Sequence, residues 1–303
     1  MSVSFKQLNK MLRYKADLRS LLFLFFTISL LGILWQYGSE MSTGLWVFLY
    51  SWQLLMAVII SVMVHNHQHL AMWTVKSLNV LTDNILTVLY GFPVFAWIPT
   101  HNTNHHVHIN KEPDYTKTYM LTERHNLLTL LIYPSLSGYK QQKAVFSYFI
   151  SSYKKNRRKF YYHLLQIISL VTCIVVAFVI NWKSALLYLI IPQQVALFSV
   201  LIFNYIQHVH ADEESAYNHS RNMTGGILNF LLLNNGLHTA HHLSPGIHWS
   251  NLRAKHDKIT PKINPQLNEH NFAWYLFRVY ILGLFSATYR TENMRQKRIK
   301  GGY

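Results

Sequence analysis

The segment LHTAHHLSPGIHWSN, residues 237–251, begins with three histidines whose spacing could hold a metal ion. Residues three and four apart lie on one face of an α-helix, so a helix would direct His238, His241 and His242 at one point. Neutral imidazole nitrogens bind zinc, copper, nickel and iron, and the ligand type alone does not name the metal. Histidines that cap helices or lie at a membrane interface are the alternative interpretation of this cluster taken alone.

Two earlier segments repeat this spacing. In HNHQH, His65 and His69 are one helical turn apart, and in HNTNHH the same separation joins His101 and His105. His106 follows directly and reaches a neighbouring position on that helix. Each segment therefore predicts ligands that reach an ion from one helix face.

A fourth segment, NYIQHVH, places Asn204 and His208 one turn apart at the end of an apolar run. The candidate ligands are then His65, His69, His101, His105, His106, His208, His238, His241 and His242. These are too many for one ion, because a structural zinc is closed by about four ligands and a catalytic zinc uses about three plus water. They predict two ions, each with roughly four or five nitrogen ligands and an open or water-bridged position.

Other histidines beside these segments are left out of the ligand set. His67, His108, His210 and His248 fall outside the shared helix faces. His67 is expected at the surface or behind a ligand, and His248 as a cap or in the path of a substrate.

The ligands need elements that bring them together, and four long apolar blocks could supply these. The blocks cover residues 21–37, 44–64, 160–182 and 184–207. A hydrocarbon core of about 30 Å needs roughly 20 helical residues, a length that the last three blocks meet and the first nearly meets. Buried core helices of a soluble protein are the alternative, but uncharged runs of this length rarely recur in soluble domains.

Basic residues avoid these blocks and indicate their orientation. The chain carries 28 Lys and Arg against 12 Asp and Glu. Almost all of the basic residues lie before the first block, between the second and third, or after the fourth, whereas the two outer turns contain only Lys183. The positive-inside rule then places both termini and every histidine segment in the cytoplasm. A nucleic-acid-binding protein would instead intersperse its basic residues through a globular sequence, so no nucleic-acid partner is expected.

The predicted fold is all-α, an integral membrane protein with four transmembrane helices and a cytoplasmic helical cap that holds a histidine-rich two-metal site. The cap comprises residues 65–159 and 208–287, and a basic tail covers residues 288–303, in which the RQKRIK segment is expected to be mobile. The whole chain, residues 1–303, forms one domain in this interpretation. Its single cysteine, Cys173, excludes an internal disulfide and iron–sulfur ligation.

Two shorter helices are expected within the cap. Residues 78–97 contain Asp83 and Asn84 and are broken by Gly-Phe-Pro, which favours an interfacial or re-entrant helix over a fifth span. Residues 272–287 alternate aromatic and aliphatic side chains around Arg278, a pattern typical of a surface helix.

The histidine motifs resemble those of the integral-membrane fatty acid desaturase and hydroxylase superfamily. HNHQH resembles its HxxxH box, HNTNHH its second box in the longer HxxxHH spacing, and HTAHH its HxxHH box. NYIQH resembles the additional ligand segment after the last span, in which Asn204 could act through water. The order of boxes and spans agrees over roughly residues 20–252.

This resemblance implies a pair of iron ions that activates O2 to remove hydrogen from an unactivated methylene of a fatty acyl or lipid substrate. The first interpretation is a desaturase in a bacterial inner membrane. A hydroxylase, or an oxidase that decarboxylates a fatty acid to an alkene, would use the same ligands, because the outcome depends on how the substrate is placed. No electron-carrier domain is visible in the sequence, so a separate donor of the ferredoxin, rubredoxin or cytochrome type is expected.

A metal transporter is the alternative from another class. Transporters place their ligands on the spans near the middle of the bilayer, whereas these histidines follow the cytoplasmic ends of the blocks. The spacing therefore favours the enzyme.

Acids near the boxes could hold the imidazoles in the ligating tautomer. The candidates are Asp83, Glu112, Asp114, Asp212 and Glu213, for each of which a surface ion pair is the alternative. Arg221, Asn222, Trp249 and Ser250 either line the path of an acyl headgroup or serve packing.

Overall fold

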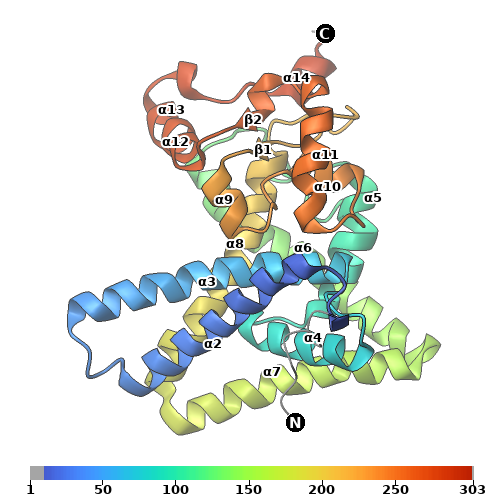
Figure 1. Cartoon of the computed structure of the whole chain (residues 1–303). Helices are drawn as coiled ribbons and strands as arrows, with labels where there is room; N and C mark the ends of the chain where they lie inside the picture. Colours follow the sequence, from blue (N-terminus) through green and yellow to red (C-terminus); the bar gives the residue numbers. More distant parts are fainter. Residues whose placement is uncertain (1–9, 302–303) are drawn as a thin grey trace. The chain divides into compact units, whose positions relative to one another are not determined.

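The computed structural model describes residues 10–301, which are mostly helical with one short pair of strands (Figure 1). Contacts within the chain divide it into two compact units. The first unit comprises Met1–Ile98 and Val145–Val200, and the second comprises Pro99–Ala144 and Leu201–Tyr303. Both units are assembled from segments far apart in the sequence, because the chain leaves and re-enters each of them.

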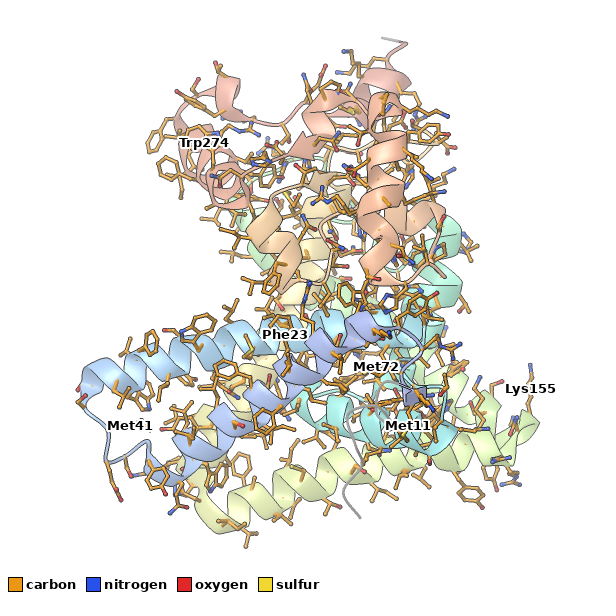
Figure 2. The ribbon with its side chains drawn as sticks, in the orientation of Figure 1. Met11, Phe23, Met41, Met72, Lys155 and Trp274 are labelled. Atoms are coloured by element: carbon orange, nitrogen blue, oxygen red, sulfur yellow. The ribbon has the colours of Figure 1, made fainter. Side chains whose placement is uncertain are left out.

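The first unit consists of long apolar helices. They are α2 (Leu18–Tyr37), preceded by a short turn at Lys15–Asp17, α3 (Thr43–His69), α4 (Lys76–Tyr90), a turn at Val94–Ala96, the end of α6 (Leu127–Lys155), α7 (Arg157–Ser184), a π-helical stretch at Ala185–Ile190 and the start of α8 (Ile191–His208). Met41 lies in the turn between α2 and α3, and Lys155 ends α6 (Figure 2).

Helix α2 has the residue pattern of a membrane span. Its buried face holds Ser20, Leu24, Thr27, Leu30 and Leu34, whereas other large apolar side chains, such as Leu22 and Phe25, are exposed. Small polar residues can pack between helices while apolar residues face lipid, since lipid offers no hydrophobic penalty for exposed carbon. Water would make the same exposure unfavourable.

Three helical runs are long and apolar enough to cross a membrane. They are Lys15–Tyr37, Thr43–His69 and Arg157–His208, and the bent pair Lys76–Tyr90 and Val94–His108 would make a fourth candidate. The last run contains both predicted spans, 160–182 and 184–207. Its 52 residues would extend about 78 Å, more than twice the hydrocarbon core. Asn181 interrupts it with a non-helical backbone (φ −158°, ψ 98°), close to the predicted outer turn.

Helix α4 supports the expectation of a broken segment at residues 78–97. It ends at Tyr90 and is capped by Gly91, whose φ of 83° lies in the left-handed region that favours glycine. Gln193 of α8 packs directly on this glycine and donates a hydrogen bond from Nε2 to the carbonyl of Val88 (2.7 Å). The buried amide of Gln193 therefore joins α8 to α4.

The second unit is built from shorter elements around the ends of α6 and α8. They are the π-helical segment Ile98–His105, α5 (His106–His108), β1 (Asn222–Met223), α9 (Gly226–Leu231), α10 (His238–Leu243), α11 (Leu252–Ile259), β2 (Asn268–Glu269), α12 (Phe272–Phe277), α13 (Gly283–Phe285) and α14 (Met294–Ile299). The strands β1 and β2 pair in parallel, with Asn222 opposite Asn268. A π-helical stretch, Arg278–Leu282, joins α12 to α13, so the expected surface helix at residues 272–287 is present as one run, Phe272–Phe285.

Two elements of the second unit differ from expectation. Helix α6, whose first part belongs to this unit, was not predicted, because Pro134 falls in its second turn and Lys154 and Lys155 occupy its last turn. The expectation of a mobile basic tail is wrong for the described residues up to 301, because α14 is attached to the unit. Arg298 Nε donates to Asp212 Oδ1 (2.6 Å), and Arg295 binds both Glu213 and Glu123.

We expect Gly91→Ala to lower the thermal stability of the detergent-solubilised protein. An added Cβ would lie 2.5 Å from Gln193 Cβ, and alanine is strained at this φ, so the free energy of unfolding should fall by about 2 kcal/mol. Gly32→Ala on α2 is the matched control, because no atom lies within 4 Å of its added Cβ. Equal melting temperatures for the two variants would contradict the close packing at Gly91.

Candidate metal centre

Four buried histidines of the second unit form a compact group. His105 ends the π-helical segment, His208 ends α8, and His238 and His242 lie on α10. One ring nitrogen from each lies within 4.8 Å of one nitrogen of every other. Three elements that are distant in sequence thus place four imidazoles at one point, and we call this group the four-histidine cluster.

The hydrogen bonds of His208 leave its inner nitrogen as an acceptor. Its Nδ1 lies 3.0 Å from the carbonyl oxygen of His219, and a carbonyl only accepts, so Nδ1 carries the proton. The lone pair of Nε2 then faces His238 Nε2 at 3.0 Å, and His242 Nε2 lies 3.1 Å from the same atom. A single proton cannot form a hydrogen bond with all three Nε2 atoms. A metal cation placed among them could accept a lone pair from each.

Asp114 fixes His105 in the same way. Its Oδ2 lies 2.8 Å from His105 Nδ1 and accepts the backbone N–H of Asn110 (2.7 Å), while Oδ1 accepts that of Thr116 (2.7 Å). Burial alone would raise the pKa of Asp114, but the interaction with His105 and these hydrogen bonds lower it below its usual range. An ionised carboxylate holds the proton of His105 on Nδ1, and the buried Nε2 has no hydrogen-bond partner among the described residues.

Burial also favours the ligating form of His242. It lowers the pKa of His242 well below the usual value, and the neighbouring imidazoles of His106, His238, His105 and His208 lower it further. Only neutral imidazole binds a metal. The donor set of the four-histidine cluster therefore fits a metal ion that prefers nitrogen ligands.

A second group lies beside it in the same unit. His106 Nε2 is 3.0 Å from His101 Nε2 and 3.0 Å from His241 Nε2. The predicted partnership of His101 with His105 is wrong, because His101 shares its group with His106 instead. Residues Ile98–His105 are π-helical, and i→i+5 bonding brings residues five apart onto one face.

The third box is divided between the groups as well. His241 belongs with His101 and His106, whereas His238 and His242 belong to the four-histidine cluster. The expectation that all three would meet at one point is therefore wrong. His238 and His242 are four residues apart and therefore lie on one face of α10. His241 directly precedes His242, so its side chain points in a different direction around the helix.

The remaining predicted histidines, His65 and His69, belong to the first unit. They occupy the last turns of α3, with ring centroids 4.8 Å apart, and the ring of His65 packs against Trp97 (5.3 Å). Helix α3 continues past residue 64, the predicted end of its span, so both histidines are part of this helix. Their service as metal ligands stays a prediction.

Of the acids proposed to support ligands, Asp114 directly contacts a clustered histidine, His105. Asp83 lies 3.5 Å from His67 and accepts hydrogen bonds from Gln68 and Tyr162. Glu112 pairs with Lys117 at the surface, and Asp212 and Glu213 pair with arginines of α14. Glu112, Asp212 and Glu213 thus form the ion pairs that were the alternative to a role behind a ligand.

The histidines left out of the ligand set also lie outside both groups. The backbone N–H of Met72 donates to His67 Nδ1, and His210 binds Thr291. His248 caps the short helix Trp249–Asn251 by accepting the N–H of Ser250, as one of its two interpretations expected.

Asn204 and the headgroup-path candidates are engaged in packing. Asn204 Nδ2 donates to the hydroxyl of Tyr133 (2.7 Å), and its action through water stays a prediction. Arg221 is fully buried and donates to the carbonyls of Ile206 and Val209, which flank His208. Asn222 accepts the N–H of Thr239 on α10. These contacts support the packing alternative, since they hold the two helices that carry clustered histidines.

His219 is a buried imidazole that the sequence interpretation missed. Its Nδ1 lies 3.2 Å from the carbonyl of Ser215, its ring centroid lies 5.6 Å from that of His242, and its own carbonyl binds His208. No helical spacing connects His219 to a box, so only the folded loop reveals its position.

A family model described as fatty acid desaturase matches residues 42–275, more than half of the chain and all three boxes. The chain belongs to the fatty acid desaturase family. No curated protein and no solved structure gives a match. Membership in this family, which also includes hydroxylases, identifies an oxidoreductase with membrane helices and histidine boxes. Members of the family typically hold two irons, and the nitrogen donors described above fit such ions.

We expect Asp114→Asn to weaken metal binding by about 10- to 100-fold, the usual effect of losing a carboxylate behind a ligating histidine. The amide keeps the shape of the side chain but no longer fixes the proton on His105 Nδ1. Competition with a chelator measures the affinity. Glu112→Gln removes a nearby carboxylate that contacts no clustered histidine and should leave the affinity unchanged. An unaffected Asp114→Asn would refute this role.

Proposed function

We propose that this protein is an O2-dependent fatty acyl desaturase of a bacterial inner membrane with a pair of iron ions. The observation that carries the proposal is the division of seven buried or half-buried histidines of the second unit into two adjacent groups with facing ring nitrogens. One group offers four nitrogens and the other three. Two ions are the simplest occupants of two such groups.

The proposed ligands follow from this division. His105, His208, His238 and His242 hold one iron, and His101, His106 and His241 hold the other. His65 and His69 complete the second set, which would otherwise have three ligands. Their support is the HxxxH spacing at the end of α3.

Bound iron would supply the activation of O2 needed to remove hydrogen from an unactivated methylene. The residues of the chain position the ligands of the iron ions. Asp114 orients His105, the His219 carbonyl orients His208, and burial lowers the pKa of His242, which favours its neutral form. The outcome of the reaction then depends on which carbon of the acyl chain is held near the site.

A hydroxylase is the second candidate. The observation that favours it is the second box, HNTNHH, whose longer spacing resembles that of membrane alkane hydroxylases and is accommodated here by the π-helical segment. Formation of a terminal alkene from a fatty acid is a third outcome on the same ligands.

The proposed topology has four spans with both termini and the metal centre in the cytoplasm. Its support is the distribution of basic residues and the two predicted spans contained in Arg157–His208. A separate electron donor would reach the centre from that side.

Lipid analysis of a host that expresses the protein tests the reaction. We expect new double bonds in acyl chains, formed only in the presence of O2, and no new products from a His238→Ala variant. New hydroxyl groups or terminal alkenes would contradict desaturation and favour the other outcomes. An expressed protein that yields none of these products would refute the enzyme.

Iron content tests the ligand assignment separately from turnover. We expect about two irons for each purified chain and a clear loss in His105→Ala, since the four-histidine cluster then keeps three ligands. His108→Ala is the matched control, because His108 lies near the box but outside both groups and should retain full iron content. One zinc and no iron in the purified protein would overturn the assignment.

A further inference from the structure

The second unit carries an open groove that lies apart from both histidine groups. It has a volume of about 820 Å³ and is formed by the start of α6, the segment that joins α12 to α13, and residues near Arg290. Specific small-molecule sites commonly have volumes of roughly 300–1,000 Å³. The groove is therefore large enough for a substantial part of a lipid molecule.

The lining of the groove is divided between cationic and apolar parts. Arg124 and Arg290 line it together with Leu127, Leu128, Leu131 and Leu284. No carboxylate is among the described residues that line it. A site with two arginines beside leucines matches a molecule that has an anionic head and an apolar tail.

Both arginines have donors available. The guanidinium of Arg124 makes no hydrogen bond or ion pair among the residues that the structure describes. Arg290 uses Nε to bind the carbonyl of Gly283 (2.8 Å), which fixes the side chain and leaves its two terminal nitrogens. Glu123, the acid next to Arg124, is engaged by Arg295. The positive charge of the groove is thus not neutralised by the chain itself.

The other polar residues that line the groove are hydrogen-bonded. His125 Nε2 lies 2.6 Å from the hydroxyl of Tyr280, and its Nδ1 lies 2.8 Å from Thr291 Oγ1. Burial lowers the pKa of His125 well below its usual value, and nearby His210 and arginines lower it further. The arginines are therefore the charged groups that an anion would meet.

The surface around the groove is apolar and exposed. Leu128 is 66% exposed, Leu284 56% and Phe285 83%, and Trp274 projects from α12 (Figure 2). Exposed apolar side chains are unfavourable in water, so a surface that carries several of them favours contact with a bilayer. Trp and arginine together are typical of the depth at which lipid headgroups lie.

We propose that this groove binds the phosphate of an anionic phospholipid, with Arg124 and Arg290 on the headgroup and the leucines against its acyl chains. Phospholipid is the amphiphile present in excess wherever this apolar surface meets a bilayer. Arginine pairs with phosphate through several charge-assisted hydrogen bonds, which gives a headgroup preference beyond general attraction to a membrane. This binding does not depend on the metal centre or on the reaction that it performs.

Native mass spectrometry of the delipidated, detergent-solubilised protein tests the proposal with phosphatidylglycerol, phosphatidylcholine and oleate as probes. We expect one phosphatidylglycerol to bind the wild-type chain more tightly than phosphatidylcholine. The double variant Arg124→Gln/Arg290→Gln should bind it at least tenfold more weakly, with unchanged iron content. Arg124→Lys/Arg290→Lys keeps both charges and should retain part of the affinity, which guards against misfolding of the glutamine variant.

The matched control is Lys258→Gln/Lys300→Gln, which removes the same charge from exposed positions of the second unit. Equal weakening in this control would show a general charge effect and overturn the site. Unchanged binding in the arginine double variant would also overturn it. If oleate binds the wild type more tightly than phosphatidylglycerol and depends on both arginines, the groove is a carboxylate site and the lipid-phosphate assignment is wrong.

Discussion

Facing lone pairs of buried imidazoles are the constraint around which the second unit is organised. His208 and His238 bring their Nε2 atoms to 3.0 Å, and His242 adds a third at nearly the same distance. Such an arrangement is unfavourable unless protons or cations separate the nitrogens, because buried polar atoms need partners. The surrounding contacts nevertheless hold the imidazoles in this arrangement. The His219 carbonyl and Asp114 hold the outer nitrogens, while Arg221 and Asn222 anchor the two helices from a single loop.

Much of the site followed from local spacing, and the errors have a common cause. The long apolar runs predicted α2, α3 and the pair α7–α8, and i, i+4 spacing identified His238 and His242 as partners. The partner of His101 was assigned wrongly because the interpretation assumed an α-helix where residues Ile98–His105 are π-helical. His219 and α14 could not be found this way, since His219 depends on a folded loop and α14 on ion pairs with Asp212 and Glu213.

The two units place different demands on the same kinds of residue. In the first, Gln193 and Ser20 are buried between helices while leucine and phenylalanine face outward. In the second, buried polar residues support histidines, and exposed apolar ones gather near α12 and the start of α6. Both units therefore contain buried polar residues and exposed apolar residues, so hydrophobicity alone does not distinguish them. What distinguishes them is the partner of each buried polar group.

The attachment of α14 affects the order in which the cluster can be assembled during synthesis. Arg298 follows Asp212 by 86 residues, so the loop that contains Asp212 and leads to His219 leaves the ribosome long before its arginine exists. Until then the buried carboxylates at 212 and 213 lack these counter-ions, and an unpaired buried charge is strongly unfavourable. The carbonyl that orients His208 is therefore expected to reach its position late, so a nascent chain would acquire its full set of oriented imidazoles only after α14 has folded.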